Sequence, residues 1–221
     1  MEFDGQAVVI TGGGGGLGRA VVRRMLDLGA EVHVPAFSRA DSAALEDTAA
    51  RVTTDVDLSD EDQVRGFYGA VPKLYASIHL AGGFSMGPLA ETDVADLERL
   101  WNMNVRTTWL CAREAARRIE GEGRIVNVSA RPALHPAPLM ATYAATKAAV
   151  AALTTNLAAE LEPRRIWVNA IVPSIIDTPT NRAAMPGADT SSWSTPDAIA
   201  ETIAFLASPA NAATHGSLVH V

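Results

Sequence analysis

Two residues suited to proton transfer stand four positions apart, Tyr143 and Lys147. On a helix this spacing places both side chains on one face. A free tyrosine titrates at about 10, and an adjacent ammonium group favours the phenolate. The pair therefore predicts a tyrosine with a lowered pKa that exchanges protons near neutral pH. The alternative interpretation is an ordinary pair of helix residues without chemistry.

A glycine run lies near the start of the chain, in the sequence VVITGGGGGLG. Glycines permit a tight turn from a strand into a helix, and they let the backbone come close to a pyrophosphate at the helix N-terminus. The run therefore predicts a dinucleotide site, with a flexible turn as the alternative. The residues assigned to this site are Gly12, Gly14, Gly15, Gly16, Leu17 and Gly18.

The second apolar stretch of the chain meets Ser38 and Arg39. At this point NAD-binding chains carry a carboxylate that holds the ribose hydroxyls. Because no carboxylate stands here to repel a 2′-phosphate, and an arginine is able to pair with one, NADP(H) is the favoured coenzyme. NAD(H) is the alternative, since Arg39 is equally compatible with a solvated surface position.

Short apolar stretches alternate with helical patterns along the whole chain. The predicted strands cover residues 7–10, 31–37, 50–55, 75–81, 124–129, 165–172 and 217–221. The predicted helices follow the glycine run, begin near 59–62, and cover 93–119, 142–162 and 197–207. This alternation is typical of a parallel sheet covered on both faces. The sequence therefore predicts one doubly wound α/β domain over residues 1–221.

Several further motifs occur in a fixed order. They are Thr11-Gly12-(x3)-Gly16-Leu17-Gly18, Asp57-Leu58, Ala81-Gly82-Gly83, Asn104, Tyr143-(x3)-Lys147, Asn169-Ala170-Ile171-Val172-Pro173 and Asp177-Thr178-Pro179. With these motifs the chain resembles the short-chain dehydrogenase/reductase family over essentially its full length. The resemblance implies a Rossmann fold and an NAD(P)H-dependent oxidoreductase that acts on a small-molecule substrate.

The resemblance also implies roles for individual residues. Tyr143 is expected to give or take the proton, Lys147 to bind the nicotinamide ribose, and Asn104 to support a water that extends the proton path. The remaining coenzyme contacts that it implies are Asp57 and Leu58 at the adenine, Ala81, Gly82 and Gly83 along the adenosine ribose, and Pro173, Ile176 and Thr178 at the nicotinamide.

Ala130 departs from the family pattern. Thirteen residues before the tyrosine, carbonyl-reducing relatives have a serine that donates a hydrogen bond to the oxygen on which charge develops. Losing such a donor costs on the order of 3 kcal/mol of transition-state stabilisation. Ser129 is adjacent, but one step along a strand turns a side chain to the opposite face. Ser129 is therefore a candidate catalytic residue only if a local bulge redirects it.

Dihydropteridine reductases are members of the family that keep the tyrosine and lysine but have alanine at the serine position. The segments 129–134 and 177–186 resemble theirs. This resemblance implies hydride transfer to a conjugated imine or carbonyl, where delocalised charge has less need of a point donor. Two alternatives remain open: a general carbonyl or 3-oxoacyl reductase that uses Ser129, and a non-catalytic nucleotide-binding member of the family.

The composition indicates a soluble globular protein, with 48% hydrophobic and 19% charged residues. A net charge of −7 argues against nucleic-acid and acidic-membrane partners. The absence of a long apolar run predicts no membrane span, and the single cysteine fits a cytoplasmic location. The five histidines lack metal-ligand spacing, so no metal is expected. The family resemblance further implies a homodimer or homotetramer.

Overall fold

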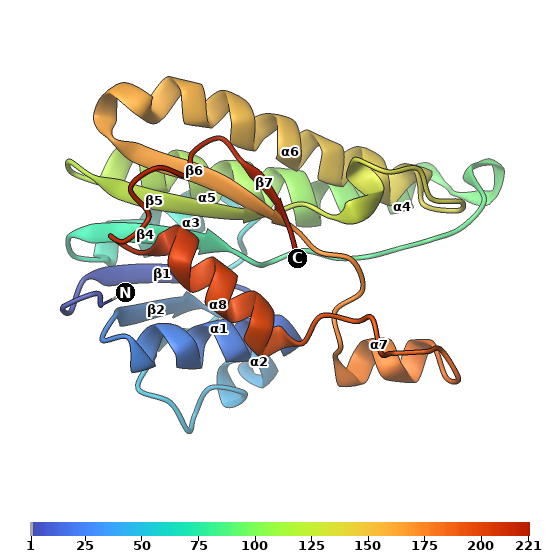
Figure 1. The fold of residues 1–221 in the computed structure, drawn as a ribbon, viewed down its shortest axis with the longest axis horizontal. Helices are drawn as coiled ribbons and strands as arrows, with labels where there is room; N and C mark the ends of the chain where they lie inside the picture. The colour runs from blue at the N-terminus through green and yellow to red at the C-terminus, as the bar shows by residue number, and fades with distance from the viewer. Residues whose placement is uncertain (1) are drawn as a thin grey trace.

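In the computed structural model, which describes residues 2–221, seven parallel strands form one sheet (Figure 1). The strands are β1 (Ala7–Thr11), β2 (Glu31–Pro35), β3 (Arg51–Thr53), β4 (Leu74–His79), β5 (Gly123–Val128), β6 (Ile166–Val172) and β7 (Leu218–His220). Their order in the sheet is β3-β2-β1-β4-β5-β6-β7. Strands β2 and β3 are added on one side of β1, and β4 to β7 are added on the other side. The direction in which successive strands are added therefore reverses between β1 and β4. The doubly wound α/β fold predicted from the sequence is confirmed.

Helices cover both faces of the sheet (Figure 1). They are α1 (Gly16–Asp27), α2 (Arg39–Ala43), α3 (Glu61–Ala70), α4 (Val94–Trp101), α5 (Thr107–Arg118), α6 (Ala141–Leu161), α7 (Pro179–Ala184) and α8 (Pro196–Ala207). Helices α1 and α8 pack on one face, and α3, α5 and α6 pack on the other. No helix within residues 2–221 is both long and apolar enough to cross a membrane.

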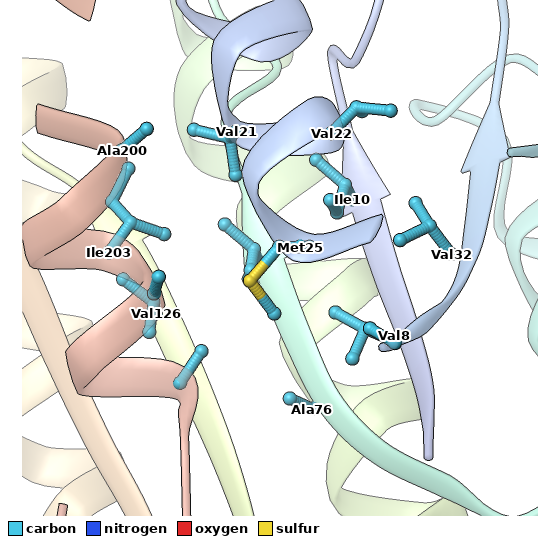
Figure 2. Close-up of a cluster of buried hydrophobic side chains, with 14 of the residues drawn as sticks. Val8, Ile10, Val21, Val22, Met25, Val32, Ala76, Val126, Ala200 and Ile203 are labelled. Carbon is cyan, nitrogen blue, oxygen red and sulfur yellow. The ribbon is translucent and has the colours of Figure 1, made fainter. Parts of the chain in front are cut away.

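The alternation of β1 explains the two-sided core. Val8 and Ile10 are fully buried on the face covered by α1 and α8, whereas Val9 is fully buried on the opposite face. Figure 2 shows Met25 of α1 and Ile203 of α8 in the first of these clusters. Strands that are apolar on both sides read as continuous hydrophobic runs, which is the pattern of a buried parallel sheet.

One predicted helix differs from the structure and another agrees with it. The helix expected over 93–119 contains a π-helical turn, Asn102–Arg106, between α4 and α5. The helix expected to begin near 59–62 does so: α3 starts at Glu61 and is capped by Asp60, whose carboxylate accepts from the amides of Asp62 and Gln63. The Ser59 hydroxyl donates to Asp57.

A buried polar network crosses the middle of the sheet at His79. Its Nδ1 lies 2.7 Å from Asn127 Oδ1, and its Nε2 lies 2.9 Å from the Ser77 hydroxyl. The Asn127 amide in turn donates to the Thr154 hydroxyl on α6. Because Asn127 Oδ1 only accepts, His79 is a neutral ring that carries its proton on Nδ1. Burial lowers the pKa of His79 to about 4.

This shifted pKa makes part of the stability dependent on pH. Between pH 6.5 and about 4, His79 is protonated in the unfolded chain but remains neutral in the folded chain. The free energy of unfolding should therefore fall as the pH is lowered through this window, by about 3 kcal/mol in total. Urea titrations of the wild type and His79→Asn should show a difference in unfolding free energy that shrinks over the same window. A pH-independent difference would contradict the assignment.

Candidate active site

The segments that carry the predicted site residues gather at one edge of the sheet. Strands β1, β4, β5 and β6 are neighbours and run parallel, so the residues that follow them meet at their carboxyl ends. Figure 1 shows α7 and the amino-terminal end of α6 on this side of the molecule. In open parallel sheets, ligands bind at the carboxyl edge beside the strand where the winding reverses.

The glycine run forms a turn that only glycine fits. Gly12 has a φ of 68°, and a Cβ there would come 2.7 Å from the Ala81 amide nitrogen. A Cβ at Gly16, the first residue of α1, would come 2.9 Å from Thr178 Cγ2. The N-cap of α1 is Gly15, which has no side chain to cap the helix. The backbone thus forms a close cradle at an uncapped helix N-terminus, which fits a dinucleotide pyrophosphate.

Asn104 joins the segment after β4 to the long helix. Its side-chain oxygen accepts from the Gly83 amide at 2.8 Å, and its nitrogen donates to the Gly83 carbonyl at 3.1 Å. A Cβ at Gly82 would lie 2.7 Å from Asn104 Oδ1 and 3.4 Å from Lys147 Nζ. The structure therefore brings together Gly82, Gly83, Asn104 and Lys147, which are far apart in the sequence.

Thr146 is a buried link that the sequence did not single out. Its hydroxyl accepts from the Asn104 amide at 3.0 Å and donates to the Tyr143 carbonyl at 2.8 Å. It therefore ties the π-helical turn to the first turn of α6, where the tyrosine lies. The available signal was its position three residues after Tyr143, which places it near the same helix face.

Lys147 is buried at the centre of the site. Its ammonium group donates to the Val128 carbonyl at 2.9 Å, at the end of β5. Burial penalises the charged form and lowers the pKa of Lys147 to about 8. The amine therefore changes charge within the range of ordinary working pH.

The pKa of Tyr143 differs from the expectation. Burial raises it to about 12, whereas the sequence predicted a lowered value from the neighbouring ammonium group. The physical reason is that desolvation of the phenolate dominates, while the lysine itself is buried and donates to the Val128 carbonyl. The ring of Phe84 packs edge-on against Tyr143 with centroids 4.9 Å apart, which contributes an apolar wall.

Ser129 does not face the position expected of a catalytic serine. Its hydroxyl donates to the backbone carbonyl of Lys147 at 2.9 Å, and the residue is 1% exposed. A hydroxyl has a single proton to donate, so none is left for a substrate oxygen. No bulge redirects the side chain, and β5 keeps its register with β6 up to Val128. The expectation that Ser129 replaces the serine missing at Ala130 is therefore corrected.

The remaining predicted coenzyme contacts lie along the same edge. Asp57 accepts from the amide and hydroxyl of Ser59, and Leu58 is buried. Ser38 caps α2, and Arg39 is exposed. The three predicted nicotinamide contacts lie after β6. The Pro173 carbonyl accepts from the Arg131 amide, and the Ile176 carbonyl accepts from the Asn181 side chain. Thr178 caps α7 and lies beside Gly16.

Comparisons with known proteins agree with this arrangement. A family model described as short chain dehydrogenase matches residues 6–188. A relative from Escherichia coli K12, the cyclic-di-GMP-binding biofilm dispersal mediator protein, is 33% identical over 94% of this chain and 91% of its own length. Carbonyl reductase [NADPH] 2 of Sus scrofa is 27% identical over 100% of this chain and 96% of its own.

Solved structures agree as well. A short-chain dehydrogenase from Burkholderia cenocepacia J2315 in complex with NADP has a TM-score of 0.90 and 28% identity. The match covers 100% of this chain and 98% of that one. Because the family model spans most of the chain and a relative above 30% identity spans nearly all of it, the chain belongs to the short-chain dehydrogenase/reductase family of NAD(P)-dependent oxidoreductases.

Proposed function

We propose that this protein is an NAD(P)H-dependent reductase of a conjugated imine or carbonyl, similar to dihydropteridine reductases, with Tyr143 as the proton donor. The proposal is supported by one observation: neither residue 129 nor residue 130 has a hydroxyl proton free to donate to a substrate oxygen. The hydroxyl proton of Ser129 is used by the Lys147 carbonyl, and Ala130 has none. A substrate that spreads its developing charge over a ring system has least need of the absent donor.

Tyr143 is suited to act as an acid. With a pKa raised to about 12, it keeps its proton throughout the neutral range and is ready to give it to a reduced substrate. Asn104 and Thr146 fix the first turn of α6, so the phenol is held in a defined place. The Phe84 ring packs edge-to-face with Tyr143 and is itself exposed, so it offers an apolar surface beside the phenol for a planar substrate.

A nicotinamide coenzyme, when bound, supplies the hydride. The residues proposed to hold it are Gly12, Gly14, Gly15, Gly16, Leu17, Gly18, Ser38, Arg39, Asp57, Leu58, Ala81, Gly82, Gly83, Tyr143, Lys147, Pro173, Ile176 and Thr178. Arg39 supports NADP(H), as does the related structure in complex with NADP. NAD(H) is the alternative coenzyme.

Lys147 should make coenzyme binding depend on pH. Its ammonium form, present below a pKa of about 8, can donate to ribose hydroxyls, and the neutral form above it is a weaker donor. The Kd for NADPH, measured by fluorescence from pH 6.5 to 9.5, should rise above pH 8. Lys147→Arg keeps its charge in this range and should bind with a flatter profile. Parallel profiles for both proteins would contradict this role.

A coenzyme-oxidation assay tests the proposed substrate class. NADPH and NADH are each offered with a quinonoid dihydropterin and, separately, with an isolated ketone such as cyclohexanone. We expect oxidation with the conjugated acceptor at a rate about 100-fold above that with the ketone, because only the ketone needs the missing donor. Equal rates would contradict the assignment, and so would a preference for the ketone.

A binding protein without catalysis is the second candidate. The alanine at position 130 favours it, and the Escherichia coli relative carries a name that states cyclic-di-GMP binding. A proton donor fixed by Asn104 and Thr146 argues against it, because binding alone has no need of one. Calorimetry with cyclic-di-GMP distinguishes the two: micromolar binding with no oxidation of coenzyme by any acceptor would favour the second candidate.

We further propose that the protein forms a homodimer or homotetramer. Val94, Leu97, Trp101 and Trp109 on α4 and α5 are exposed. The family resemblance implies that this surface is buried against a second copy. Such a concentration of exposed large apolar side chains is typical of an interface. Light scattering after size exclusion should give a mass at least twice that of one chain. Trp109→Glu should lower that mass.

A further inference from the structure

Asp41 holds both hydrogen-bond donors of Ser38 at the start of α2. The Ser38 amide donates to Asp41 Oδ2 at 3.2 Å, and the Ser38 hydroxyl donates to the same oxygen at 2.9 Å. The Asp41 amide donates back to the Ser38 hydroxyl at 3.2 Å. The two groups of Ser38 that could bind a phosphate are therefore already occupied by a carboxylate of the protein itself.

The position of Asp41 is fixed by the glycine run. A Cβ at Gly14 would come 2.9 Å from Asp41 Cα, so the backbones of the two residues are in direct contact. Strand β2, which leads into Ser38, is the neighbour of β1, which leads into the glycine run. The carboxylate thus lies beside the proposed dinucleotide loop, and no ion pair within residues 2–221 neutralises it.

We propose that Asp41 is a specificity-determining residue that weakens binding of the 2′-phosphate of NADP(H), so that the protein also uses NAD(H). The inference rests on the coenzyme site proposed above. A 2′-phosphate carries about two negative charges and must compete with the carboxylate for Ser38, and like charges within about 4 Å repel each other strongly in a partly buried site. A free 2′-hydroxyl is neutral and can donate to Asp41.

Arg39 acts in the opposite sense. It is exposed two residues before Asp41, and its guanidinium attracts a phosphate. The sequence alone suggested NADP(H) because the position directly after β2 lacks a carboxylate. In the structure the Asp41 carboxylate, in the first turn of α2, lies next to this position because it accepts hydrogen bonds from Ser38. The coenzyme preference is then set by the balance between Arg39 and Asp41.

Calorimetric titration with NADPH and NADH tests the proposal without any turnover. Asp41→Asn keeps an oxygen that can accept from Ser38 and removes only the charge. We expect its Kd for NADPH to fall about tenfold, while its Kd for NADH changes by less than about twofold. Glu46→Gln, the matched control, removes the same charge from an exposed side chain five residues further on, and it should leave both values within about twofold.

Each outcome decides the matter. If Asp41→Asn binds NADH but keeps the wild-type ratio of the two Kd values, the role of Asp41 is overturned and the proposed function stands. If neither the wild type nor any variant binds either dinucleotide, both proposals are overturned. Asp41→Ser removes the charge and offers a hydroxyl oxygen that can still accept from Ser38. It replaces Asp41→Asn should that variant unfold, and it should show the same gain for NADPH alone.

Discussion

Tyr143→Phe should lower kcat by about 1,000-fold while leaving the Kd for coenzyme within about threefold of wild type. The variant loses the proton donor, and a positioned general acid contributes about 10²–10⁴ in rate. It keeps the ring that packs against Phe84 and the backbone carbonyl that accepts from Thr146, so the fold of the site is maintained. Stopped-flow oxidation of NADPH and equilibrium fluorescence titration measure the two quantities.

The matched control for this variant is Thr146→Val, which removes the hydroxyl but not the phenol. Because Thr146 acts through the position of Tyr143, we expect a smaller loss of about tenfold in kcat with an unchanged alkaline limb of the pH profile. Wild-type turnover by Tyr143→Phe would contradict the proposed acid. Equal losses in kcat and in coenzyme affinity would instead mean that the residue serves binding.

Ala130→Ser should create activity toward isolated ketones. The new hydroxyl stands at the position from which relatives donate to the substrate oxygen, and one such donor contributes about 100-fold to kcat. Ala130 is 4% exposed and lies two residues after the end of β5, so the added oxygen is held by its surroundings. We expect kcat/KM for cyclohexanone to rise about 100-fold and that for a quinonoid dihydropterin to change by less than about threefold.

Ser129→Ala is the matched control for that gain. Its hydroxyl donates to the Lys147 carbonyl, so its loss should reduce the free energy of unfolding by about 1 kcal/mol. Activity toward either acceptor should stay within about threefold. A large loss of turnover in Ser129→Ala would contradict the structural role given to Ser129, and an unchanged ketone rate in Ala130→Ser would contradict the account of the missing donor.

The fold was predictable because its signals are local. Each of these signals, such as the apolar runs of β1, β4 and β6 and the turn at Gly12, consists of residues that are consecutive in the sequence. The alternation of these strands with helices predicts a parallel sheet. The convergence of Gly82, Asn104 and Lys147 was implied only by resemblance to a family. The proximity of residues 82 and 147 cannot be predicted from their spacing in one sequence, because it depends on the order of the strands in the sheet.

Other features depend on packing that a sequence does not display. Tyr143 and Lys147 stand on one helix face as predicted, but burial decides both pKa values, so the tyrosine is raised and not lowered. The π-helical turn at 102–106 has no residue signature, and it places Asn104 against Gly83. The hydrogen bond between Ser38 and Asp41 weakens the inference from Arg39 that NADP(H) is preferred. This hydrogen bond depends on the geometry of α2 and was not predicted from the sequence.

Loss of deuterium from NADPH labelled at C4, in the presence of a quinonoid dihydropterin, tests the central claim most directly. Mass spectrometry of the oxidised coenzyme should find one deuterium lost per turnover for the wild type, when the transferred face of the nicotinamide carries the label. Tyr143→Phe should form about 1,000-fold less of this oxidised coenzyme in equal time, because the hydride still comes from the nicotinamide but the proton donor is gone. Bound coenzyme that keeps its deuterium with the pterin and with every other conjugated acceptor would contradict the account and leave a binding protein in its place.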